Sequence, residues 1–123
     1  MITINEIEKL AEAIKVKYNI EYDFEGIKHI EKIIEIERLY STGNHRNNSI
    51  LSFGAFLGQS IILNYGGKWS FDDEWFKVYC IEFNINNRQQ KIFPFGKVAK
   101  QYQNGTEDSI TSFFYIIQIA IND

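Results

Sequence analysis

The chain has 123 residues, and its 13 lysines and arginines against 16 aspartates and glutamates give a formal net charge of −3. This length fits one domain, and a hydrophobic content of 45% is enough to bury a core, which argues against disorder. The acidic balance argues against a nucleic acid or an anionic membrane as partner. Cys80 is the only cysteine, so the chain forms no internal disulfide.

Two amphipathic helices are predicted at the start of the chain. Thr3 followed by Glu6 is a capping-box pattern, and apolar residues then recur at helical spacing over residues 4–18. After a break at 19–22, Asp23 can cap a second helix that runs to about Leu39. Its broad apolar stripe predicts that one side of this helix is buried.

A polar loop and a third helix are expected next. Residues 41–48 combine glycine, asparagine and serine, which are turn formers, and Asn48 or Ser49 can then cap a helix over 50–64. This helix is apolar on nearly all sides, which predicts that it is the central element. Gly54 and Gly58 lie four residues apart and leave a strip where a neighbour can approach closely.

The uncharged stretch over 47–67 is almost long enough to span a membrane. Its asparagines, serines and glutamine would be costly in lipid, so we interpret it as a buried helix and expect no membrane partner. The first residues lack the basic and long apolar regions of a signal peptide. We therefore expect a cytoplasmic protein.

After Gly67 the apolar period changes to two, which predicts a three-stranded antiparallel meander. The predicted segments are strand 68–71, an acidic turn 72–74, strand 75–83, a turn 84–88 and strand 90–93. A short helix is predicted over 95–103, and Thr106 can cap a last helix over 107–121. The predicted fold is α+β, with three N-terminal helices, a small three-stranded antiparallel sheet and two C-terminal helices.

No catalytic or metal-binding constellation is visible. His29 and Glu25 could share a metal ion, but no third ligand accompanies them, so we predict no metal and no other cofactor. His45 lacks a visible orienting partner, and Cys80 lies within a strand, which favours a buried structural thiol.

Two groups of charged residues are candidate binding elements. The acidic run over 72–74 lacks the alternating spacing of a calcium loop, so a solvated turn explains it. Arg88, Lys91, Lys97 and Lys100 form the only local concentration of positive charge and could bind an anionic group. Aromatic residues nearby could stack on single-stranded nucleic acid, but the acidic balance of the chain opposes this function.

A candidate binding surface combines the polar loop and the acidic turn. These segments would expose donors, acids and aromatic rings on loops that rigid elements hold in place. The alternative is two ordinary turns whose aromatic rings belong to the core. The candidate residues are Asn44, His45, Arg46, Trp69, Asp72, Asp73 and Trp75.

Three segments of the chain form a recognisable pattern: residues 54–62 with Gly66-Gly67-Lys68-Trp69 after them, residues 93–98 and residues 104–110. This pattern resembles small bacterial domains of unknown function of the DUF3806 type, and the resemblance covers residues 50–115. Such families often carry an acid after the second helical glycine, whereas Gln59 stands here. The resemblance implies a fold and a bacterial origin, and it implies no activity.

Three functions are compatible with these patterns. The first is a non-catalytic protein-binding module, such as an immunity or accessory protein of a bacterial toxin or defence system. The second is a small-ligand binding domain that uses the turn around Trp69 and Trp75 and the surface of the sheet. The third is an enzyme that uses His45 and the acidic turn. Small size, acidity and the missing catalytic constellation favour the first.

Overall fold

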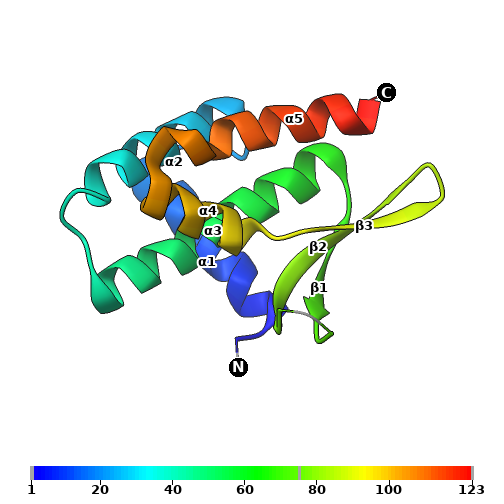
Figure 1. Cartoon of the computed structure of the whole chain (residues 1–123), viewed down its shortest axis with the longest axis horizontal. Coiled ribbons are helices and arrows are strands. Elements are labelled where there is room, and N and C mark those ends of the chain that lie inside the picture. Colours follow the sequence, from blue (N-terminus) through cyan, green and yellow to red (C-terminus); the bar gives the residue numbers. More distant parts are fainter. Residues whose placement is uncertain (1, 75, 123) are drawn as a thin grey trace.

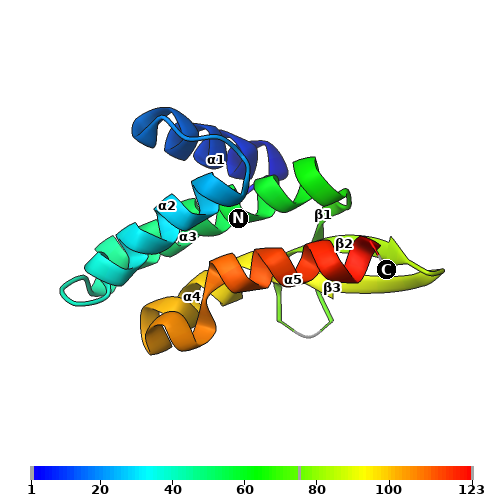
Figure 2. The same ribbon diagram turned by 90° about the horizontal axis from the view of Figure 1, so that it is seen from above.

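The longest helix, α3 (Gly43–Tyr65), runs through the middle of the protein, which a computed structural model describes for residues 2–74 and 76–122 (Figure 1). It packs against α1 (Ile4–Tyr18) on one side and α4 (Pro94–Asn104) on the other, as Figure 2 shows. Phe56, Leu57 and Ile61 on this helix are fully buried. The prediction of a central third helix is therefore confirmed.

The first two helices start at the predicted caps. The Thr3 hydroxyl accepts from the Glu6 amide at 3.2 Å, and the Glu6 carboxylate accepts from the Thr3 amide at 3.2 Å. Asp23 accepts from the amide of Gly26 at 2.8 Å at the start of α2 (Phe24–Glu37). This helix ends two residues before the predicted end at Leu39.

The prediction of a polar loop over residues 41–48 is wrong for most of these residues, because α3 already begins at Gly43 and not near Ile50. The reason is a long side chain in the first turn of α3. The Arg46 guanidinium donates to the Arg38 carbonyl at 3.0 Å and to the Ser41 hydroxyl at 3.4 Å, and it lies 5.4 Å from the centre of the Tyr102 ring. These tertiary contacts override the low helix propensity of the glycine and asparagines.

The sheet is an antiparallel meander in the order β1 (Lys68–Asp72), β2 (Val78–Ile85) and β3 (Arg88–Ile92), as predicted. Trp69 pairs with Ile81, and Ile81 pairs with Ile92. The two-residue turn between β2 and β3 is formed by Asn86 and Asn87, both in the left-handed region that asparagine tolerates. The predicted boundaries shift: β2 begins at Val78 because Phe76 still belongs to the turn, and β3 begins at Arg88.

Two helices follow the sheet, as predicted, but the last one starts later than expected. Thr106 and Glu107 belong to a 3₁₀ turn, η1 (Gly105–Asp108), and α5 (Ile110–Asn122) begins after it. The amide of Ser112 donates to the Ser109 hydroxyl at 3.2 Å, so Ser109 takes the capping role that was predicted for Thr106. The α5 helix packs on α2 and α3 (Figure 2).

Gly54 and Gly58 lie where neighbouring rings press on α3. A Cβ atom at Gly54 would come within 3.0 Å of the Phe95 Cα, and one at Gly58 would overlap the Trp69 indole. The predicted close approach is confirmed, and it sets the distance of both the sheet and α4 from the central helix.

Candidate binding surfaces

The candidate residues Asn44, His45 and Arg46 lie on the first turn of α3. Asn44 and His45 are exposed, whereas Arg46 is half-buried and holds α3 to the end of α2 through the contacts described above. The His45 Nε2 atom lies 3.8 Å from the Glu37 carboxylate. This turn is therefore partly used to join two helices.

The candidate residue Trp69 is a core residue on β1. Its ring lies against Gly58 and stacks on Phe95 with 5.8 Å between the ring centres. Its indole N–H donates to the Gln59 side-chain oxygen at 3.1 Å, which gives Gln59 a structural role. Trp75 lies outside the described residues.

The acidic run is not a fully solvated turn, because Asp72 is buried at the end of β1. The Lys91 ammonium lies 2.9 Å from one Asp72 oxygen, and the Phe76 amide donates to the other at 2.8 Å. The hydrogen bond to Asp72 raises the pKa of Lys91. Asp73 is exposed, and its carbonyl accepts from the Lys77 ammonium at 2.6 Å.

The two halves of the predicted binding surface, the polar segment over 44–48 and the turn around Trp69 and Trp75, adjoin each other only through residues at their edges. Asn47 and Asn48, next along α3, border a shallow hollow together with Phe71 and Lys77. His45 lines a different hollow, beside Tyr18 and Glu37. Over residues 2–74 and 76–122, no group of three or more histidine, cysteine, aspartate or glutamate side chains could hold a metal ion.

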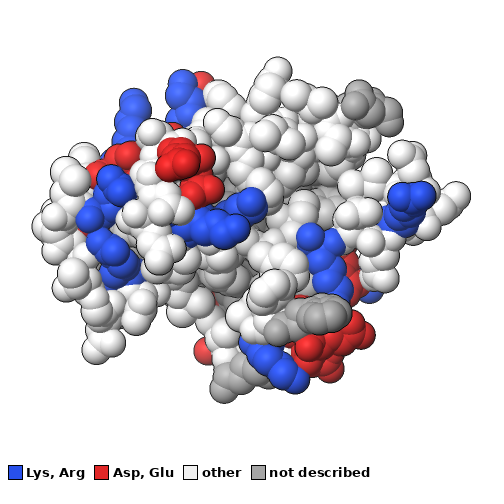
Figure 3. Space-filling view, viewed as in Figure 1, with Lys and Arg blue, Asp and Glu red and all other residues white. Residues whose placement is uncertain are grey.

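An apolar surface that the sequence analysis missed lies on α5. This helix carries no lysine, arginine, aspartate or glutamate, and the region over α5 is free of charged side chains in Figure 3. Tyr115, Ile116 and Ile119, at helical spacing, are 50%, 60% and 47% exposed, and Phe24 of α2 forms a shallow hollow with the first two. We call Phe24, Tyr115, Ile116 and Ile119 the α5 face. The signal that could have found it is an uncharged helix with more apolar residues than one core-facing stripe needs.

Polar contacts at its first turn hold α5 in a fixed position. The Ile110 amide donates to the Gln101 side-chain oxygen at 2.8 Å, and the Thr111 amide donates to the Glu31 carboxylate at 3.0 Å. Ser109 donates to the same Glu31 oxygen at 2.5 Å. The α5 face is thus presented by a helix anchored to both α2 and α4.

A second site brings three of the four clustered basic residues predicted from the sequence together with aromatic residues. Lys91, Lys97 and Lys100 line one pocket together with Phe93 and Phe95. Arg88 does not line this pocket, and lies at the opposite end of β3 from Phe93.

The chain matches no protein-family model, no curated protein and no solved structure. Within the described residues, no helix combines the length and the apolar character that crossing a membrane requires.

Proposed function

We propose that this chain is a non-catalytic protein-binding module whose α5 face packs against an apolar surface of a partner protein. One observation carries the proposal: four large apolar side chains are 40% to 60% exposed on and beside a helix without a charged residue. Contiguous exposed apolar surface of this kind marks protein-protein contact sites.

The composition of the α5 face supports a protein partner. The centres of protein interfaces are poor in charged residues and rich in aromatic ones, and the α5 face contributes Phe24 and Tyr115. Because α5 is anchored through Gln101 and Glu31, little ordering entropy is lost when a partner binds.

The proposal includes the biological setting expected from the sequence. Small size and acidity are compatible with an immunity or accessory protein of a bacterial toxin or defence system, acting in the cytoplasm. The bacterial setting is supported by the resemblance over residues 50–115.

The experiment is a comparison of three tagged proteins as baits in lysate of the encoding cells. We expect the wild-type chain to retain one partner at near-stoichiometric yield and Ile116→Asp to lose it. Val16→Asp is the matched control, because Val16 is 70% exposed on α1 and lies outside the α5 face. Circular dichroism verifies that both variants fold. Equal retention by Ile116→Asp, or an empty wild-type bait, contradicts the proposal.

A further inference from the structure

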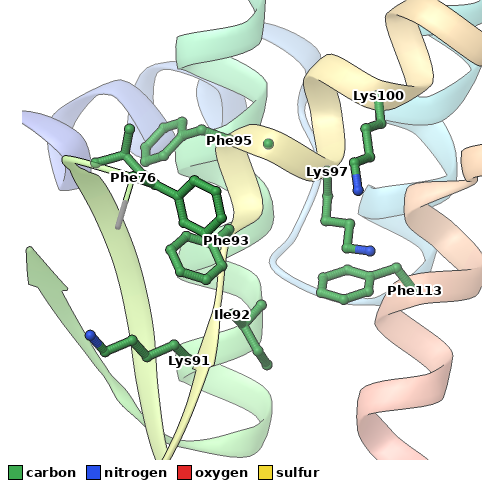
Figure 4. A pocket seen from close by; sticks show the side chains of 10 residues that line it. Phe76, Lys91, Ile92, Phe93, Phe95, Lys97, Lys100 and Phe113 are labelled. Carbon is green, nitrogen blue, oxygen red and sulfur yellow. The ribbon is translucent and has the colours of Figure 1, made fainter. Parts of the chain in front are cut away.

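A pocket of about 500 Å³ opens between the end of β3, the start of α4 and the side of α5 (Figure 4). Four phenylalanine rings form much of its wall: Phe76, Phe93, Phe95 and Phe113. The Phe76 and Phe93 rings meet edge to face, with 5.1 Å between their centres. We call this site the phenylalanine pocket. Its volume falls in the range of pockets that hold small organic ligands.

The three lysines of the phenylalanine pocket differ in whether a nearby carboxylate balances their charge. Lys91 is 2.9 Å from the buried Asp72 carboxylate, so its charge is balanced within the protein. Lys97 and Lys100 extend from α4 on the side opposite Lys91 (Figure 4). Among the residues that the structure describes, no carboxylate lies within ion-pair distance of either one.

The position of Lys97 places positive charge directly beside apolar surface. Its ammonium lies 4.8 Å from the centre of the Phe113 ring, where the ring quadrupole attracts a cation. Lys100 follows one turn later on the same helix. One end of the phenylalanine pocket therefore carries two ammonium groups, and the rest of its wall is largely apolar.

We propose that the phenylalanine pocket binds a free amphipathic monocarboxylate, with its hydrocarbon tail among the phenylalanine rings and its carboxylate at Lys97 and Lys100. Charge complementarity selects the anion, because no carboxylate of the described residues lies within ion-pair distance of Lys97 or Lys100, whereas Lys91 is paired with Asp72. The tail is selected by the apolar wall, since each buried methylene adds to the binding free energy. This site is separate from the α5 face and does not depend on the function proposed for that face.

The test is calorimetric titration of the full chain with decanoate below its micellar concentration. We expect saturable binding of one decanoate per chain, and binding of octanoate about tenfold weaker because two methylenes are lost. Acetate, which has no tail, and decyltrimethylammonium, which has the opposite charge, are expected to bind at least tenfold more weakly than decanoate.

Variants locate the site. Lys97→Glu and Lys100→Glu are each expected to weaken decanoate binding about tenfold or more, and Phe76→Ala, at a 66% exposed ring, about fivefold. Lys9→Glu makes the same charge change at an exposed position of α1 and is expected to leave the affinity unchanged. Because all four side chains are partly or fully exposed, we expect the variants to fold, and circular dichroism verifies this.

Three outcomes overturn the proposal. The first is that decanoate does not bind. The second is that decyltrimethylammonium binds as tightly as decanoate, which leaves an apolar hollow without charge selection. The third is that Lys9→Glu weakens binding as much as Lys97→Glu, which indicates a response to net charge and not a site. None of these results bears on partner capture by the α5 face.

Discussion

Gly58 of α3 lies directly beneath the indole ring of Trp69 from β1, so that a Cβ atom at position 58 would be 2.5 Å from the ring Cζ2 and 3.1 Å from Cζ3. The ring is also fixed from the side, because its N–H donates to Gln59 of the same helix. The glycine thus sets the distance between the sheet and the central helix.

Gly58→Ala is expected to lower the free energy of unfolding by about 1–3 kcal/mol, because the sheet or the helix must shift to make room for the methyl group. Urea denaturation measures the change. Gly96→Ala is the matched control, since the nearest atom to a Cβ there is Phe93 Cβ at 3.9 Å, and alanine favours a helix. If both variants lose the same stability, the contact between Gly58 and Trp69 is not the cause.

Lys91→Met is expected to destabilise the fold more than the double variant Asp72→Asn/Lys91→Met. The single change leaves the buried Asp72 carboxylate without its cation, whereas the double change removes both charges. Lys91→Arg retains a cation and is expected to stay closest to the wild type. Thermal denaturation of the three variants gives the order, and a single variant at least as stable as the double one contradicts the account.

Features encoded by neighbouring residues were predictable from the sequence. Thr3 with Glu6 and Asp23 mark helix starts because a cap acts within one turn. The change of apolar period after Gly67 predicted the sheet, and the spacing of Gly54 and Gly58 predicted a close approach. These signals were enough for the order of elements and for the central position of α3.

Features that depend on residues far apart in the chain were not predictable. The early start of α3 rests on Arg46 and its contact with Tyr102, and the burial of Asp72 rests on Lys91 from another strand. The candidate site failed to emerge for a related reason. Polar loops are visible as such in the sequence, whereas the exposed side of α5 is recognised only when its core-facing side is known.

The stability of the protein is expected to fall as the pH rises above about 10, in part because of Tyr102. Burial of its ring and the hydrogen bond from its hydroxyl to the Glu37 carboxylate, at 2.8 Å, raise the pKa of Tyr102 above its ordinary value of 10.0. Between these two pKa values the unfolded state binds fewer protons than the folded state, so the free energy of unfolding decreases with pH. Below pH 9 this group contributes no pH dependence.

Tyr102→Phe isolates this contribution, because Tyr22 also has a raised pKa and titrates in the same range. From pH 10.5 to 11.5 the wild type is expected to lose up to about 1.4 kcal/mol more than Tyr102→Phe, the value for one proton over one pH unit. Urea denaturation at the two pH values measures the difference. Parallel losses in both proteins would show that Tyr102 ionises as readily in the folded state as in the unfolded one.

Gln101→Met is expected to lower the free energy of unfolding by about 1–3 kcal/mol and to loosen the first turn of α5. Gln101 is fully buried, accepts from the Ile110 amide at 2.8 Å and donates to Glu35 at 3.1 Å. Methionine has a similar shape but leaves the Ile110 amide buried without an acceptor. Gln103→Met, at an exposed position of α4, is the matched control and is expected to change little.

Hydrogen exchange distinguishes a local effect from a general loss of stability. If Gln101 anchors α5, the amides of Ile110, Thr111 and Ser112 should exchange faster in Gln101→Met. The increase should be larger than the loss in the free energy of global unfolding accounts for. Partner capture by the α5 face should then weaken as well, because the partner must order a looser helix. Uniformly faster exchange across α1 and α5 would instead make Gln101 a general core contact, and the rigidity of the α5 face would need another source.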